Sequence, residues 1–194
     1  MARPEPPTGP ETSGAPTVTM HTALGTIAIE AYPDRAPLAA SQFLHCVQTG
    51  YYDGGTFWRT VRADNDRGSP PIDVVQAAVA EGSATLEPLA HEPTSMSGLR
   101  HRDGTVSLAR AAPGTATAAA FFICLGDQPA LDEGGLRNAD SLGFAAFGRV
   151  VRGMEVVRAI HWGATLAEAP AEYIRGQVLA TPVRVERAVL GGGA

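Results

Sequence analysis

Short segments of alternating apolar and polar residues, separated by turns that contain glycine, most constrain what this chain can fold into. Such alternation has the two-residue period of a strand with one buried face. The first two segments, 18–22 and 26–30, flank a short Gly-containing loop and predict a β-hairpin. We expect further strands at 56–61, 72–76, 105–108, 121–125, 145–151 and 183–190.

Only two stretches carry helical signals. Pro37, shortly after Asp34, opens a segment whose apolar residues recur at near-helical spacing, and Gly50 ends it. A shorter helix is predicted at 154–160. Many short strands with two modest helices, and no alternating βαβ pattern, favour a mainly β fold built as a closed or nearly closed antiparallel barrel.

Length and composition indicate one globular domain. The chain has 194 residues, of which 44% are apolar. Residues 1–16 are rich in Pro, Gly, Thr and Glu and contain no apolar run, so we predict a disordered arm there. The predicted domain spans 17–190, and 191–194 form a flexible Gly-rich tail.

Charge and hydropathy argue against two classes of partner. The formal net charge is −5, and the fifteen cations, all Arg, form no dense basic stripe, so we expect no binding to nucleic acid. No window is apolar over the roughly 18 residues that a membrane span requires, so we expect no membrane insertion. The N-terminus lacks the profile of a signal peptide, which favours the cytoplasm; a periplasmic protein whose signal was removed stays open.

Motifs for metals and cofactors are missing from the sequence. The five His residues are scattered, without metal-ligand spacing. Residues 64–68 look like the start of a calcium loop, but Val75 stands where that loop needs a bidentate Glu. We therefore expect no metal and no cofactor. We interpret Cys46 and Cys124 as two buried free thiols, with a single disulfide as the open alternative.

Several motifs follow one another in a particular order along the predicted domain. They are APLAASQFLHCVQTGYYDG at 36–54, TFWR at 56–59, VVQ at 74–76, GTVSLAR at 104–110, FFIC at 121–124, LD at 131–132 and FGRVVRGMEVV at 147–157. Each motif is weak alone, but in this order the chain resembles the cyclophilins from 18 to 190. The resemblance implies a closed eight-stranded antiparallel barrel, capped by two α-helices, with a proline-binding groove on one outer face.

The resemblance also implies an activity. Cyclophilins isomerise X–Pro peptide bonds without a cofactor, so the expected partners are proline-containing segments of client proteins, and we expect a monomer. Arg59 occupies the family's position for the donor that stabilises the twisted bond. Gln76 matches the glutamine that orients the peptide and this arginine. From spacing alone, Arg59 would be interpreted as a solvated arginine on a strand surface.

Other groove residues are matched position by position. Phe122 and Leu131 match the floor and wall of the pocket for the proline ring, and plain core packing is the alternative for both. Ala109 and Arg110 match a stretch whose backbone pairs with the substrate ahead of proline. Phe144 stands in place of a groove histidine and is predicted to refill part of the apolar groove.

The pocket also departs from the family pattern. Asp73 and Val74 replace a Phe-Met pair, so an aromatic wall and a thioether are missing, without replacement in the local sequence. Ala130 replaces the tryptophan that contacts cyclosporin in sensitive members. We therefore predict measurable but reduced isomerase activity in protein folding, with poor sensitivity to cyclosporin. The alternative is a non-catalytic barrel that binds proline-containing peptides or acts as a holdase.

Overall fold

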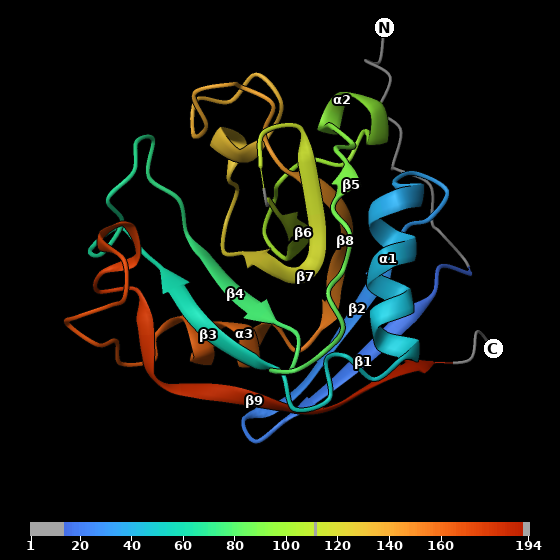
Figure 1. Ribbon diagram of the computed structural model, residues 1–194, viewed down its shortest axis with the longest axis horizontal. Coiled ribbons are helices and arrows are strands. Elements are labelled where there is room, and N and C mark those ends of the chain that lie inside the picture. Colours follow the sequence, from blue (N-terminus) through green and yellow to red (C-terminus); the bar gives the residue numbers. More distant parts are fainter. Residues whose placement is uncertain (1–13, 111, 192–194) are drawn as a thin grey trace, which may run out of the picture.

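Strands make up most of the regular structure in the computed structural model, which describes residues 14–110 and 112–191 (Figure 1). The helices are α1 (Pro37–Gln48), α2 (Thr94–Ser97) and α3 (Met154–His161), with two single turns of 3-10 helix, η1 (Pro129–Leu131) and η2 (Glu172–Ile174). The strands are β1 (Thr17–Thr22), β2 (Gly25–Ala31), β3 (Thr56–Val61), β4 (Val74–Ala78), β5 (Leu89–Ala90), β6 (Thr105–Ala109), β7 (Thr115–Cys124), β8 (Ala145–Arg152) and β9 (Val178–Gly191).

Strand pairing closes the sheet into a barrel. Neighbouring strands follow the order β4-β3-β9-β1-β2-β8-β6-β7, all antiparallel, and β4 pairs with β7 to complete the ring. The short strand β5 adds to β7 outside this ring of eight. In Figure 1, α1 lies on one side of the barrel, while α3 lies near β3 and β4. Closure leaves the eight strands without a long open edge.

The predicted fold class is confirmed, with differences at the ends of some strands. The closed eight-stranded antiparallel barrel and both predicted helices are present, and α2 and β5 are additional. Strand β7 begins at Thr115 rather than at 121, because its first half alternates only the small residues Thr and Ala, which give a weak apolar pattern. Of the predicted arm 1–16, only 14–16 lie within the described residues, and residues 192–194 of the predicted tail lie outside them.

Aromatic rings fill one side of the barrel core beneath α1. The ring of Phe43 on this helix lies 4.7 Å from Phe147, 5.5 Å from Tyr52 and 5.6 Å from Phe121, measured between centroids. All four side chains are fully buried. Burying such rings gives the largest apolar contribution per residue to folding.

The first turn of α1 is satisfied by a residue far along the chain. Pro37 at the first turn needs no amide partner, and the buried carboxylate of Glu92 accepts hydrogen bonds from the N–H groups of Leu38 and Ala39 at 3.0 and 2.8 Å. A negative charge at a helix N-terminus also interacts favourably with the helix dipole. This contact fixes the helix against the segment between β5 and α2.

Both cysteines are buried free thiols, as predicted. Burial raises the pKa of Cys46 to about 11 and raises that of Cys124 well above its ordinary value, so neither is a reactive thiolate near neutral pH. None of the described helices is long and apolar enough to cross a membrane.

Candidate functional site

One row of side chains crosses three neighbouring strands on the outer face of the barrel. Arg59 on β3 lies directly opposite Gln76 on β4, and Gln76 lies directly opposite Phe122 on β7. The adjacent row, which contains Phe57 and Phe121, points into the core and is fully buried. Successive rows alternate between the two faces of a sheet, so the register places the three predicted residues side by side.

A β-bulge explains why Arg59 faces outward. Residues two apart on a regular strand share a face, so Arg59 would follow Phe57 into the core. The pairing of β3 with β4 instead steps from Phe57–Ala77 to Arg59–Gln76, which leaves Trp58 as an extra residue. A bulge of this kind redirects the next side chain to the other face. The arginine therefore avoids the desolvation cost of the barrel core.

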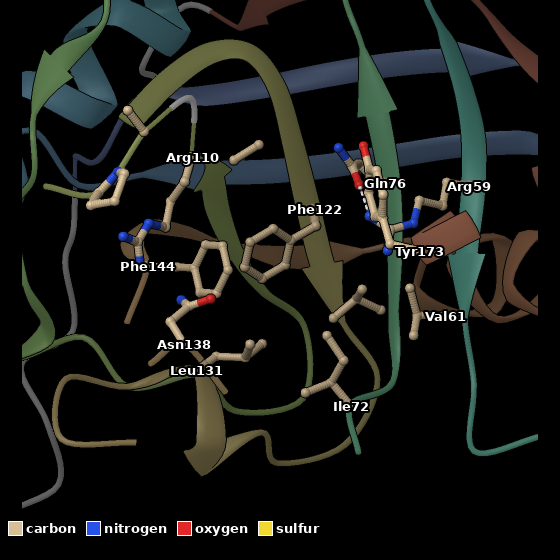
Figure 2. Close-up of a pocket in the computed structure, with 14 residues that line it drawn as sticks. Arg59, Val61, Ile72, Gln76, Arg110, Phe122, Leu131, Asn138, Phe144 and Tyr173 are labelled. Carbon is tan, nitrogen blue, oxygen red and sulfur yellow. Dashed lines mark hydrogen bonds between the residues drawn. The ribbon is translucent and has the colours of Figure 1, made fainter. Parts of the chain in front are cut away.

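A pocket of about 390 Å³ lies over this row (Figure 2). All eight residues predicted for the site line it: Arg59, Val74, Gln76, Ala109, Arg110, Phe122, Leu131 and Phe144. Six further lining residues were not predicted: Val61, Ile72, Ala112, Pro113, Asn138 and Tyr173. The structure brings the predicted residues together, and the chemical role of each one stays a prediction.

Phe122 forms the apolar floor of the pocket. Its ring meets that of Phe144 edge-on, with centroids 5.2 Å apart and planes at 89°. Figure 2 shows the two rings side by side in the pocket. Edge-to-face pairs of this kind are favourable. Leu131 beside it is fully buried. Phe122 is 6% exposed, so the ring is packed like a core residue while one side borders the pocket.

A polar network lies behind the floor. The ring of His101 stacks on Phe122 at 5.9 Å, donates from Nδ1 to Asp132 at 2.8 Å, and accepts at Nε2 from the hydroxyl of Ser107 at 3.0 Å. Burial lowers the pKa of His101 despite the carboxylate. This Ser–His–Asp order resembles a nucleophilic triad, but Ser107 is fully buried and has no access to a substrate. The network supports the floor and performs no acyl chemistry.

The apolar wall above β4 is rebuilt in part by neighbouring residues. Ile72 and Val61 are 8% and 1% exposed and pack with Val74 along the pocket. Asp73 points elsewhere, with Oδ1 3.5 Å from Nε2 of His161. Ile72 therefore adds apolar surface beside Val74 where the sequence lacks the Phe-Met pair, and the expected loss of pocket volume stays a prediction.

Two glutamines hold the guanidinium of Arg59. Nη1 donates to Oε1 of Gln76 at 3.0 Å, and Nε and Nη2 donate to Oε1 of Gln177 at 3.0 and 2.7 Å. The ring of Tyr173 lies 6.0 Å from Cζ. Burial lowers the pKa of Arg59, but an arginine starts from so high a value that it stays charged at neutral pH.

Gln177 was not predicted as a site residue, because the sequence pattern places the start of the last strand several residues after it. β9 begins at Val178 rather than at 183. From Phe57 to Arg59 the pairing advances two residues along β3, while along β9 it moves five residues, from Val183 to Val178. Residues 179–182 therefore bulge out of the ladder. This bulge brings the residue before the strand beside Arg59. A lone glutamine in an expected loop gives no sequence signal of such a contact.

Arg110 borders the end of the pocket opposite Arg59. It forms an ion pair with Asp140, its Nη1 donates to O of Gly143 at 3.3 Å, and its Cζ lies 5.8 Å from the ring centroid of Phe144. Hydrogen bonding from Arg110 lowers the pKa of Asp140 to about 2. β6 pairs with β8 only up to the residue before Ala109, and both Ala109 and Arg110 line the pocket beyond that point.

A buried ion pair joins the two loops that frame the pocket. The carboxylate of Asp66, 1% exposed, accepts from Nη1 and Nη2 of Arg137 at 2.8 and 2.7 Å, and from the N–H groups of Gly68 and Ile72 at 3.0 and 2.8 Å. Burial raises the pKa of Asp66, but these hydrogen bonds outweigh it and leave the pKa below its ordinary value. The pair holds Ile72 and Asn138 at the pocket.

Comparison with known proteins decides what kind of barrel this is. The sequence profile of the family described as cyclophilin type peptidyl-prolyl cis-trans isomerase/CLD matches residues 17–181. The chain belongs to the cyclophilin family. Within the part of this cyclophilin that the structure describes, no group of three or more His, Cys, Asp or Glu side chains could hold a metal ion.

Curated relatives support the same conclusion. Peptidyl-prolyl cis-trans isomerase B of Escherichia coli is 34% identical over 149 residues, which cover 76% of this chain and 85% of the relative. A peptidyl-prolyl cis-trans isomerase of Streptomyces antibioticus is 33% identical over 144 residues, with 74% and 82% covered. By family, this cyclophilin is an isomerase of peptidyl-prolyl bonds.

Solved structures agree on the fold. A cyclophilin type isomerase of Cryptosporidium parvum superposes with a TM-score of 0.68 at 16% identity, covering 93% of this chain and 99% of that one. The same parasite protein, crystallised in the presence of the dipeptide Ala-Pro, gives a TM-score of 0.67 at 17% identity, with 91% and 99% covered.

Proposed function

We propose that this cyclophilin accelerates X–Pro bond rotation with Arg59 as the donor to the prolyl nitrogen. The observation that carries the proposal is the row Arg59–Gln76–Phe122, which places a fixed cation beside an apolar pocket. Peptide-bond rotation faces a barrier of roughly 18–20 kcal/mol, because amide resonance is lost in the twisted state. Any group that recognises the twisted state better than the planar one lowers this barrier.

The chemistry of the twisted bond selects the donor. Without resonance, the prolyl nitrogen becomes pyramidal and regains a lone pair, which accepts a hydrogen bond that the planar amide accepts poorly. An arginine N–H directed at this nitrogen therefore stabilises the transition state more than the ground state. The reaction moves no proton and breaks no covalent bond, so the chain needs to supply binding, orientation and charge alone.

The pocket supplies binding for the proline ring. We infer that the ring packs on Phe122, with Leu131 and Phe144 beside it, since these three side chains form its apolar end. The residues ahead of proline would then run along Ala109 and Arg110. The Ala-Pro dipeptide named with the parasite cyclophilin supports a proline-containing ligand. The proposed partners are proline-containing segments of client proteins, bound by a monomer.

We infer a reduced rate from the altered wall. Val74 and Ile72 are smaller than the Phe-Met pair of many relatives and offer the proline ring a smaller apolar surface. A decrease of about 1.4 kcal/mol in transition-state stabilisation lowers turnover tenfold. The fixed donor is retained, so the proposal is a slow isomerase rather than an inert barrel.

A protease-coupled assay tests the proposal against the non-catalytic alternative. Peptides that differ in the residue before proline are cleaved only in the trans form, with and without the chain. We expect the chain to shorten cis-to-trans conversion below the tens to hundreds of seconds that it takes without a catalyst. Peptide binding without acceleration, measured in parallel by fluorescence anisotropy, would instead identify a binding module or holdase.

A further inference from the structure

Some of the N–H donors of the Arg59 guanidinium are engaged within the chain, and the others are left for a ligand. An arginine carries five N–H groups in a planar fork. Three of those of Arg59 are engaged: Nε and one on Nη2 with Gln177, and one on Nη1 with Gln76. One N–H on each terminal nitrogen is therefore left for the pocket that the side chain lines. Figure 2 shows Arg59 and Gln76 joined at the edge of that pocket.

Gln177 is itself fixed on every side. It is 1% exposed, and its Nε2 donates to O of Asn65 at 3.0 Å, which settles that Oε1 faces the arginine. Its backbone N–H donates to O of Ile174 and its backbone O accepts from N of Thr60, both at 2.9 Å. A side chain held in this way sets the plane of the guanidinium from behind, where a substrate does not reach.

Both side chains that hold Arg59 are neutral. Among the described residues, no carboxylate forms an ion pair with it. Asp66 influences its pKa from nearby, but that carboxylate is paired with Arg137. A carboxylate in contact with the guanidinium would cancel much of its field in a partly buried site, where charge interactions are strong. The amides orient the cation and leave its charge available to the substrate.

We propose that Gln177 is a positioning residue for isomerisation, which aims two N–H groups of Arg59 at the bound X–Pro bond while leaving the arginine's charge uncompensated. This inference rests on the proposed function. It gives the segment between α3 and β9 a role in orienting Arg59, in addition to that of Gln76 on β4. Gln76 holds one corner of the guanidinium, and Gln177 holds the other two.

Two substitutions of Gln177 separate the orientation of the Arg59 guanidinium from the effect of a negative charge beside it. Q177M removes the acceptor at similar volume, and Q177E keeps an acceptor for Arg59 but adds a negative charge. Both remove the bond from Nε2 to Asn65, so the loss of this bond is common to the two variants. The matched control is Q42M, since Gln42 on α1 also joins two backbone groups, O of Glu87 and N of Ala118, and does not line the pocket.

The kinetic constants are measured by NMR exchange during titration of an Ala-Pro-containing peptide. We expect kcat to fall about tenfold or more in Q177M and in Q177E, with KM within about twofold, because the effect is confined to the transition state. Q42M should lower Tm and leave kcat unchanged. Wild-type kcat in Q177M would overturn the positioning role, and recovery of wild-type kcat in Q177E would overturn the role of charge. An inactive wild-type chain would instead contradict the proposed function.

A measurement on the wild type keeps the inference testable if the variants fold poorly. The Nε–H of Arg59, held by a buried amide, should give a sharp ¹⁵N-correlated NMR signal with slow hydrogen exchange, and the signal should persist when peptide is bound. A signal broadened by exchange with water in the free and bound chain would contradict the positioning role.

Discussion

Arg59 and Gln76 lie directly opposite each other on β3 and β4, and one hydrogen bond of 3.0 Å joins their side chains on the outer face of the barrel. Direct cross-strand neighbours on one face are held by the ladder between them. A donor mounted in this way keeps its position better than one on a loop. Arg59 and Gln76 can therefore be substituted one at a time to test the contribution of each to catalysis.

Replacing Gln76 with Leu should weaken catalysis more than stability. The substitution frees one corner of the guanidinium, and we expect kcat/KM to fall about tenfold, which corresponds to about 1.4 kcal/mol of transition-state stabilisation. Tm should change little, since the half-buried amide has no other side-chain bond in the described residues. Unchanged kcat/KM in the protease-coupled assay would contradict the role of this pair.

Replacing Phe122 with Ala should remove the floor on which the proline ring packs. We expect KM to rise at least about tenfold, and stability to fall by about 3–5 kcal/mol because the ring is also packed like a core residue. The matched control is F147L, which alters a fully buried ring away from the pocket. It should lower the free energy of unfolding and leave KM unchanged. Equal KM values for wild type and F122A would place the proline elsewhere.

Replacing Asp66 with Asn should release the two loops that frame the pocket. Breaking a buried ion pair leaves Arg137 uncompensated and costs about 3–5 kcal/mol. The folded-state pKa of Asp66 lies below its unfolded value, so the stabilisation is present above pH about 4 and is lost as pH falls through the folded-state pKa. Urea unfolding of wild type and D66N should therefore differ at neutral pH and converge in acid.

An exposed ion pair nearby provides the control for the Asp66 measurement. Asp64 is 70% exposed and pairs with Arg62 at 3.2 Å. Such surface pairs contribute about 0–1 kcal/mol, so D64N should leave the unfolding curve almost unchanged at every pH. A D66N chain as stable as D64N at neutral pH would contradict the structural role of the buried pair.

Ala130 predicts weak inhibition by cyclosporin. It packs against the apolar cluster of the pocket, and the resemblance matches it to the tryptophan that contacts cyclosporin in sensitive cyclophilins. We expect A130W to lower the inhibitory concentration at least about tenfold, a gain of about 1.4 kcal/mol in binding. Dose–response curves in the isomerase assay measure this change. Strong inhibition of the wild type, or no effect of the tryptophan, would show that this position does not set sensitivity.

Local patterns in the sequence predicted what depends on local structure. The hairpin of β1 and β2 and the helix that begins at Pro37 follow from alternation, turn residues and a helix-start signal, and the structure contains them. The neighbourhood of Arg59, Gln76 and Phe122 came from resemblance, because register across three strands is not visible in any one of them. Their common pocket was therefore predictable only through the family.

The rest depends on contacts between distant segments. Gln177 reaches Arg59 because β9 bulges, and a bulge is set by both partners of the ladder. Tyr173, in the turn of helix just before Gln177, lines the pocket as part of the same segment. Ile72 lines the pocket because Asp66 binds its N–H group and Arg137 from another loop. Neither an isolated glutamine nor an isolated aspartate in a loop carries a sequence signal of such a partner.

Exchange NMR on an X–Pro peptide, with catalytic amounts of wild type or R59A, tests the role of Arg59 most directly. Both chains should bind the peptide, since the apolar end of the pocket, formed by Phe122, Leu131 and Phe144, is unchanged. We predict exchange between cis and trans signals in the wild type, and a rate at least about 100-fold lower in R59A, the decrease typical of removing one transition-state donor. Equal exchange rates for the two chains would contradict Arg59 as the donor.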